Sequence, residues 1–150
     1  MIDEIDRKIL DALQRDSAQS LDVLGETVGL SRNATWRRVK ALEDAGVIKG
    51  RVALLDPSKL ALGLSVFIQV RTQQHNAKWL EQFRRATRNM PEILAAYRMT
   101  GDLDYLVHAR VEDMSAYDAL YRRLVEKVEM SDVSASFVME ELKATTALPL

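Results

Sequence analysis

Residues 29–48 read GLSRNATWRRVKALEDAGVI, and they decide how the first part of the chain folds. Apolar side chains recur along this stretch at the spacing of one helix face. At 100° per residue, Thr35, Val39 and Leu42 point within about 40° of one direction. The stretch therefore predicts a helix that Ser31 caps and that the glycine of DAG ends.

Two shorter helices are expected before this one. Apolar residues recur at helical spacing between Ile2 and Leu13, and a second helix is expected between Ser20, as its N-cap, and Gly29. Three short helices with a glycine-containing turn before the third describe a helix-turn-helix. The following segment, VIKGRVALLD, alternates in polarity and predicts one or two short strands, as in a winged helix-turn-helix.

The second half of the chain changes to an apolar period of two, which is typical of strands. The pattern predicts a strand from Leu64, helices over 79–90 and 114–128, and strands over 93–100, 104–111 and 133–140. The order βαββαβ closes into a ferredoxin-like antiparallel sheet with both helices on one face, so the fold class is α+β. Phe67 lies on the other face, which we expect a second subunit to cover.

Composition excludes several classes of protein. The chain has 150 residues, 47% of them hydrophobic and 29% charged, as in an ordinary globular protein. It has no cysteine, which excludes disulfide scaffolds and thiolate zinc sites. The N-terminus does not resemble a signal peptide, and no apolar run approaches the roughly 20 residues that cross a bilayer. A cytoplasmic protein without membrane segments is expected.

The net charge is only −1, but the charge is unevenly distributed. Residues 1–30 carry seven acidic and three basic side chains, whereas residues 31–51 carry six basic and two acidic ones. This local basic surface favours a nucleic-acid partner, double-stranded DNA, even though the whole protein is nearly neutral.

The outward face of the third helix carries donors suited to DNA. Asn33 and Arg37 could make bidentate contacts to base edges, while Lys40 points the same way and suits phosphates. A basic run alone is more often a solvated helix face, and Trp36 could equally be a peripheral core residue. The candidate DNA-binding residues are Ser31, Arg32, Asn33, Trp36, Arg37, Arg38 and Lys40.

At this point two independent groups of motifs resemble the Lrp/AsnC (feast/famine) transcriptional regulators. IDRKILDALQRD, LGETVGLSRNATWRRVKALEDAGVIKG and VALLDPSKLALG are similar to the DNA-binding half of that family. YRMTGDLDYLVHARVEDMSAYD and SFVMEELKATTALPL are similar to its ligand-binding half, often called the RAM domain. The TTALPL-like tail resembles a subgroup in which some members respond to cysteine. One difference is Ala34-Thr35, where many members carry Pro-Cys.

The turn in TGDLDY is a candidate site for an amino-acid effector. Exposed backbone N–H groups around Gly101 could hold a carboxylate, and Asp102 or Asp104 could accept from an ammonium group. From the sequence alone, a plain hairpin turn is the commoner explanation. The resemblance implies an effector pocket between dimers, closed by a neighbour's segment before the last strand. The residues it implies are Thr100, Gly101, Asp102, Asp104, Tyr105, Ser134 and Ser136.

The resemblance also implies a homodimer that assembles into a tetramer or octamer, with an amino acid, small aliphatic or sulfur-containing, as effector. The expected domains are residues 1–50 for DNA binding, a linker strand over 51–61, and residues 62–150 for effector binding and oligomerisation. His75 and His108 are the only histidines, and no catalytic or metal motif is present, so we expect neither enzyme activity, nor a metal, nor a cofactor. The alternatives are an enzyme of the sirohaem decarboxylase type and a stand-alone amino-acid sensor module.

Overall fold

The computed structural model describes residues 2–150, which form two compact units. One unit contains the residues up to Leu54 together with Leu142–Leu150, and the other contains Leu55–Glu141. The structure thus groups the C-terminal tail with the first unit, whereas the expected second domain covers all of residues 62–150.

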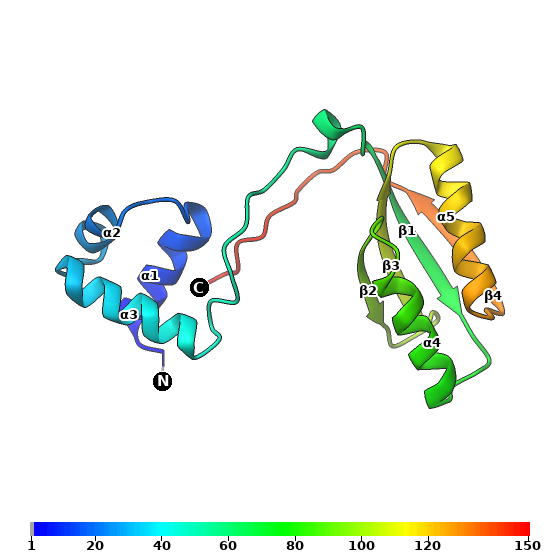
Figure 1. Cartoon of the computed structure of the whole chain (residues 1–150), viewed down its shortest axis with the longest axis horizontal. Coiled ribbons are helices and arrows are strands. Elements are labelled where there is room, and N and C mark those ends of the chain that lie inside the picture. The colour runs from blue at the N-terminus through cyan, green and yellow to red at the C-terminus, as the bar shows by residue number, and fades with distance from the viewer. Residues whose placement is uncertain (1) are drawn as a thin grey trace. The chain divides into compact units, whose positions relative to one another are not determined.

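The first unit is a three-helix group, shown with its labels in Figure 1. It consists of α1 (Glu4–Arg15), α2 (Leu21–Val28) and α3 (Arg32–Asp44). The side chains of Ser20 and Ser31 accept the backbone N–H groups that cap α2 and α3, and Gly29 ends α2 in the left-handed region at φ 73°. The expected helix-turn-helix is confirmed. Its core consists of Ile9, Leu13, Leu24, Val39 and Leu42.

Gly25 sets how closely α2 approaches the start of α3. A Cβ atom at this position would lie 2.6 Å from the carbonyl oxygen of Leu30 and 3.1 Å from Oγ1 of Thr35, which is fully buried. We expect Gly25→Ala to lower the free energy of unfolding by about 1–3 kcal/mol, because a backbone carbonyl cannot move aside cheaply. Urea unfolding measures this, with Gly50→Ala as the control, since an added Cβ there meets nothing within 4 Å. Equal midpoints for the two variants would contradict the close packing at Gly25.

The strands expected after α3 are not formed. Residues 47–56 have no regular secondary structure, and the N–H groups of Val47 and Ile48 instead donate to the carbonyl of Leu42 at 2.9 and 3.2 Å. Alternation in a sequence makes a strand only where a neighbouring strand supplies hydrogen-bond partners. Among the residues that the structure describes, no strand pairs with this segment.

The second unit has the expected order of elements. A short 3₁₀ helix, η1 (Pro57–Leu60), precedes β1 (Leu64–Arg71), α4 (Ala77–Arg88), β2 (Ile93–Arg98), β3 (Tyr105–Val111), α5 (Met114–Lys127) and β4 (Asp132–Phe137). The strands form one antiparallel sheet in the order β2-β3-β1-β4. The expected ferredoxin-like sheet is confirmed, although β2 and β4 each end earlier than the pattern suggested.

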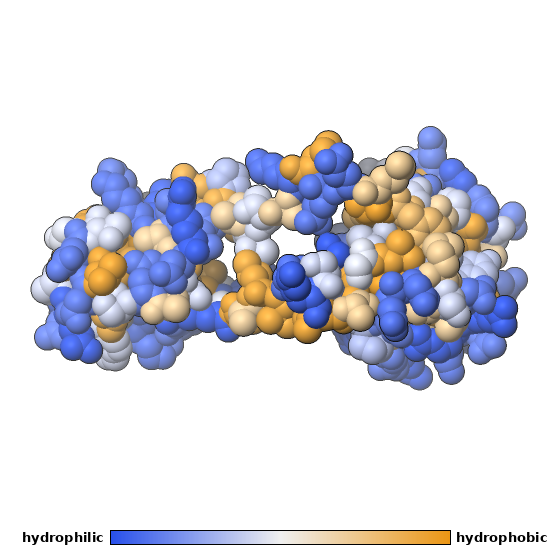
Figure 2. All heavy atoms as spheres, turned by 90° about the horizontal axis from the view of Figure 1, so that it is seen from above, coloured by the Kyte–Doolittle hydropathy of each residue, from blue (hydrophilic) through white to orange (hydrophobic). Residues whose placement is uncertain are grey.

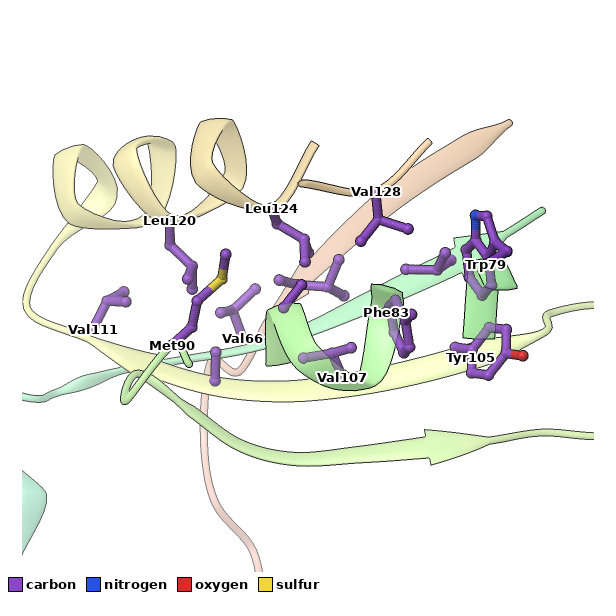
Figure 3. Close-up of a cluster of buried hydrophobic side chains, with 14 residues drawn as sticks. Val66, Trp79, Phe83, Met90, Tyr105, Val107, Val111, Leu120, Leu124 and Val128 are labelled. Atoms are coloured by element: carbon purple, nitrogen blue, oxygen red, sulfur yellow. The ribbon is translucent and has the colours of Figure 1, made fainter. Parts of the chain in front are cut away.

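Both helices cover the same face of the sheet, as Figure 3 shows for their buried side chains. Alternate residues of β1 and β3 point into this layer, among them Val66 and Val107, which are fully buried. Leu120 and Leu124 of α5 meet them from above, and Phe83 of α4 closes the layer. Along β3, buried and partly exposed residues alternate strictly, so this strand has a buried face and an open face.

None of the helices within residues 2–150 combines the length and the apolar character that a bilayer crossing needs.

Candidate DNA interface and effector loop

The face of α3 turned away from the core carries the residues expected to read DNA. Thr35, Val39 and Leu42 are buried, which leaves the opposite side of the helix in solvent. Arg37 is exposed there and has no ion-pair partner within residues 2–150. Trp36, which the sequence left open, is 54% exposed and is therefore not a core residue.

Arg38 lies in a different setting from its neighbours. Its Nη1 donates to Asp3 and to Asp6 at 2.7 Å each, so it joins α3 to the capping box at the start of α1. The backbone N–H of Asp6, and then the Arg38 guanidinium, hold the pKa of Asp3 below its ordinary value. The charge of Arg38, one of the candidate DNA-binding residues, is thus engaged inside the unit.

The other cations of α3 lie near acids that are more exposed. Lys40 donates to Asp44 one turn later at 2.6 Å, and Arg32 lies 4.0 Å from Asp22. Exposed ion pairs of this kind contribute little to the stability of the fold, so the cation can leave its acid and bind another anion. The hydroxyl oxygen of Ser31 accepts the N–H of Ala34 and caps α3. Asn33 is exposed on the same face of the helix as Arg37.

The loop between β2 and β3 is the expected hairpin turn. Gly101 adopts φ 105°, a conformation that favours glycine, and the N–H of Met99 donates to the carbonyl of Asp104 at 2.8 Å. Thr100, Gly101 and Asp102 are exposed at the tip. The Asp104 carboxylate, in contrast, accepts the N–H of Thr72 at 2.8 Å, so one of its oxygens already has a partner.

Three of the candidate effector residues lie away from this tip. Tyr105 is buried, and its ring lies 5.1 Å from that of Trp79 and 4.7 Å from that of Phe83, so it is a core residue and its side chain does not line the loop. Ser134 and Ser136 are exposed on β4, and Ser134 donates to Gln69 of β1 at 3.2 Å. One chain therefore does not gather these serines with the tip of the loop into a single pocket.

Arg71 is a residue of this region that the sequence did not single out. Its Nε donates to the carbonyl of Asp102 and its Nη1 to the carboxylate of Asp132, both at 2.7 Å. It therefore ties the hairpin to the start of β4 at one end of the sheet. Strand alternation placed Arg71 on the open face, but its partners lie 31 and 61 residues away, and no local pattern indicates them.

A second feature missed by sequence reasoning is a basic cavity of about 460 Å³ between α4 and β2. Arg84, Arg88 and Arg98 line it, and no acidic residue does. None of the three forms an ion pair within residues 2–150. Guanidinium groups without acids beside them can hold a carboxylate, so this cavity is a second place where an amino-acid carboxylate could bind.

The open face of the sheet is centred on an aromatic pair. The rings of Phe67 and His108 stack with centroids 4.6 Å apart, and His108 Nε2 shares a hydrogen bond of 2.8 Å with Oγ of Ser65. Burial and the nearby charge of Arg110 lower the pKa of His108, while Glu141 opposes this shift. The face thus favours a neutral histidine.

The lowered pKa of His108 predicts how stability depends on pH. Below its ordinary value of 6.5 the unfolded chain takes up a proton more readily than the folded one, so the free energy of unfolding falls as the pH is lowered. We expect His108→Gln to lose less stability than the wild type between about pH 7.5 and about pH 5.5 in urea titrations. Identical pH dependence in the two proteins would contradict this role of His108.

No group of three or more metal-ligating side chains lies together in residues 2–150.

Comparison with known proteins also divides the chain into two parts, but it counts the tail up to residue 148 with the second part. Residues 2–49 match the model of the winged helix-turn-helix DNA-binding family, and residues 65–148 match that of the Lrp/AsnC ligand binding domain. The glutamate uptake regulatory protein of Zymomonas mobilis is 49% identical over 99% of this chain and 91% of its own length. The DNA-binding transcriptional activator DecR of Escherichia coli is 48% identical over 100% of this chain and 99% of its own.

A solved structure is also similar along its whole length. The crystal structure of a transcriptional regulator from Neisseria meningitidis in complex with L-Met has a TM-score of 0.94 and 37% identity, and the match covers 99% of this chain and 97% of that one. These relatives are regulators that match both halves of the chain, so a decarboxylase and a stand-alone sensor are not favoured. The chain belongs to the Lrp/AsnC family and is a DNA-binding transcriptional regulator.

Proposed function

We propose that this regulator acts in the cytoplasm as a homodimer or a larger assembly whose DNA affinity changes when an amino acid binds near the β2–β3 loop. The observation that carries the proposal is the exposed face of α3, where Arg37 and Asn33 lie beside Trp36 and have no side-chain partner among residues 2–150. Such a face can reach base edges in the major groove while the buried side of the helix holds it in register.

Assembly would cover the open face of the sheet. This face carries Phe67 and His108, and Tyr97 of β2, which is 55% exposed. Figure 2 shows hydrophobic residues at the surface. Exposed apolar side chains also occur in the segments after α3 and after β4, at Val52, Leu54, Leu55, Met139 and Leu142. Two DNA-binding units related by a two-fold axis would reach major grooves about one helical turn apart, or a multiple of it.

The amino-acid effector is supported by the chemistry of the loop. Backbone N–H groups around Gly101 can bind a carboxylate, and Asp102 is exposed and can accept from an ammonium group. A neighbouring subunit would add Ser134 and Ser136 from its β4, which one chain leaves in solvent. In the Neisseria relative the ligand is L-Met, which fits a small aliphatic or sulfur-containing amino acid here.

A thermal-shift screen of the twenty amino acids tests the effector. We expect one or a few of them to raise the melting temperature, because a ligand that binds only the native state stabilises it by mass action. Asp102→Asn is expected to abolish the shift, whereas Arg98→Gln, which alters the basic cavity, is expected to keep it. If Arg98→Gln alone abolished the shift, the cavity between α4 and β2 would be the effector site instead of the loop.

A further inference from the structure

The C-terminal tail is bound to α1 by an unusual pair of hydrogen bonds. The N–H of Leu148 donates to Oε1 of Gln14, and Nε2 of Gln14 donates to the carbonyl of Leu148, each at 2.8 Å. One side-chain amide thus satisfies both backbone groups of one residue, as a neighbouring strand would. The two residues are 134 positions apart in the sequence.

The tail also contributes to an apolar groove on the first unit. A cavity of about 410 Å³ lies between α1 and the segment that follows α3, with Leu148 and Leu150 in its wall. Pro149 favours an extended conformation for Leu148, which places the two leucines on the same side of the tail. The apolar side chains that line the groove are Ile2, Leu10, Leu13, Val47, Ile48, Leu148 and Leu150.

The tail is held at the surface and is not part of the core. Leu148 and Leu150 remain 68% and 50% exposed, whereas the core leucines Leu13 and Leu24 are almost completely buried. A contact made of two hydrogen bonds and two half-exposed leucines is weak alone. It persists because the chain itself keeps the tail near the groove at a high effective concentration. Such a contact is suited to opening and closing.

We infer that residues 147–150 form a strap, a second and releasable attachment of the DNA-binding unit to the ligand-binding unit, docked in the groove of the same chain. The first attachment is the covalent connection through residues 45–56. Ten residues, 138–147, join the end of β4 to Leu148. With both attachments in place, the DNA-binding unit loses less conformational entropy when two such units bind a two-fold symmetric operator. We therefore expect DNA affinity to be higher in the docked state.

The strap also gives the effector a route to the DNA-binding unit, and this part rests on the proposed function. Ser134 and Ser136 lie in β4, directly before the residues that lead to the strap. An effector held against β4 that binds the docked and released states unequally would shift the population of the docked strap, and reciprocally the strap would change the affinity for the effector.

Hydrogen exchange tests the docking without DNA or effector. In the full-length protein the Leu148 amide is expected to exchange more slowly than an unstructured amide, and Gln14→Ala is expected to remove that protection. Thr146→Ala is the matched control, because Thr146 is an exposed tail residue outside the groove. A Leu148 amide that exchanges equally fast in the wild type and in Gln14→Ala would overturn the inference.

The lack of native cysteine allows a test of whether docking occurs within one chain. Ser17→Cys and Leu150→Cys, both in the wall of the groove, leave Gln14 and Leu148 in place. They are introduced together and joined by a short thiol-specific cross-linker. We expect the product to keep the mass of one chain on a denaturing gel. A product of twice that mass would mean that the tail docks on another copy, and it would overturn the single-chain strap.

DNA binding tests the consequence of docking. A chain that lacks residues 145–150, and Gln14→Ala in the full chain, are both expected to bind a specific site about tenfold more weakly, a factor within the usual range for coupled sites. Unchanged affinity in both, with Leu148 protected in the wild type, would overturn the strap as a coupling element. Failure of the wild type itself to bind DNA would instead refute the proposed function and leave the exchange result standing.

Discussion

Replacing Arg37 with alanine is expected to weaken binding to a specific operator by about 1–3 kcal/mol, roughly five- to 150-fold, if it makes a bidentate contact to a base. Arg37 is exposed on the outward face of α3, and no acidic group of residues 2–150 competes for its guanidinium group. Its loss is expected to relax the preference for one base pair, because the same donors cannot pair equally well with all four base pairs.

Fluorescence anisotropy at fixed salt measures this effect on specific and on scrambled DNA. Arg15→Ala is a suitable control, since Arg15 is an exposed arginine that pairs with Asp11 on α1 and not on the reading face. The control is expected to retain its preference for the specific site. If Arg37→Ala and Arg15→Ala lost the same small amount of affinity on both DNAs, α3 would not be the reading helix.

Phe67→Asp is expected to separate the subunits. Phe67 stacks on His108 at the centre of the open sheet face, so a second subunit on that face would bury the new carboxylate. Arg110, a cation on the same face, is already paired with Glu141 at 3.2 Å. An unpaired buried charge costs several kcal/mol, so the dissociation constant of the dimer should rise by roughly a hundredfold or more. The affinity for a two-fold symmetric operator should fall as the dimer dissociates, because two linked DNA-binding units bind far more tightly than one.

Sedimentation equilibrium measures the mass of the assembly, and circular dichroism confirms that the separated chains are folded. Gln82→Asp is the control, because Gln82 is exposed on α4, whose buried side packs on the opposite face of the sheet, and it should leave the mass unchanged. A Phe67→Asp protein that keeps the wild-type mass would show that this face is not the one that joins subunits.

The elements that depend on local signals could be predicted from the sequence. Ser20 and Ser31 cap their helices as expected, and the alternation from Leu64 onward predicted the burial of Val66, Ile68 and Val70, although Ser65 on the other face is buried as well. Both signals act within a few residues, because helix capping and strand alternation depend on near neighbours. The strands expected over residues 47–56 are absent from the structure. A strand needs a hydrogen-bonded neighbouring strand, and the local sequence pattern does not show whether one is present.

The parts that depend on distant partners could not be predicted. Arg38 reads as one more cation of α3, but Asp3 and Asp6, more than thirty residues earlier, engage its charge. No sequence pattern around Gln14 indicates its hydrogen bond to Leu148, 134 residues later. Tyr105 is different, because it alternates with Val107 on the buried side of β3, and strand parity alone could have assigned it to the core.

Selection of binding sites from a random DNA pool tests the central claim, that the outward face of α3 reads DNA in a two-fold assembly. The wild type is expected to enrich a two-fold symmetric motif with half-sites about one helical turn apart, or a multiple of it. The double variant Asn33→Ala/Arg37→Ala, folded and of wild-type mass, is expected to enrich no such motif. Enrichment of the same motif by the double variant would contradict the account.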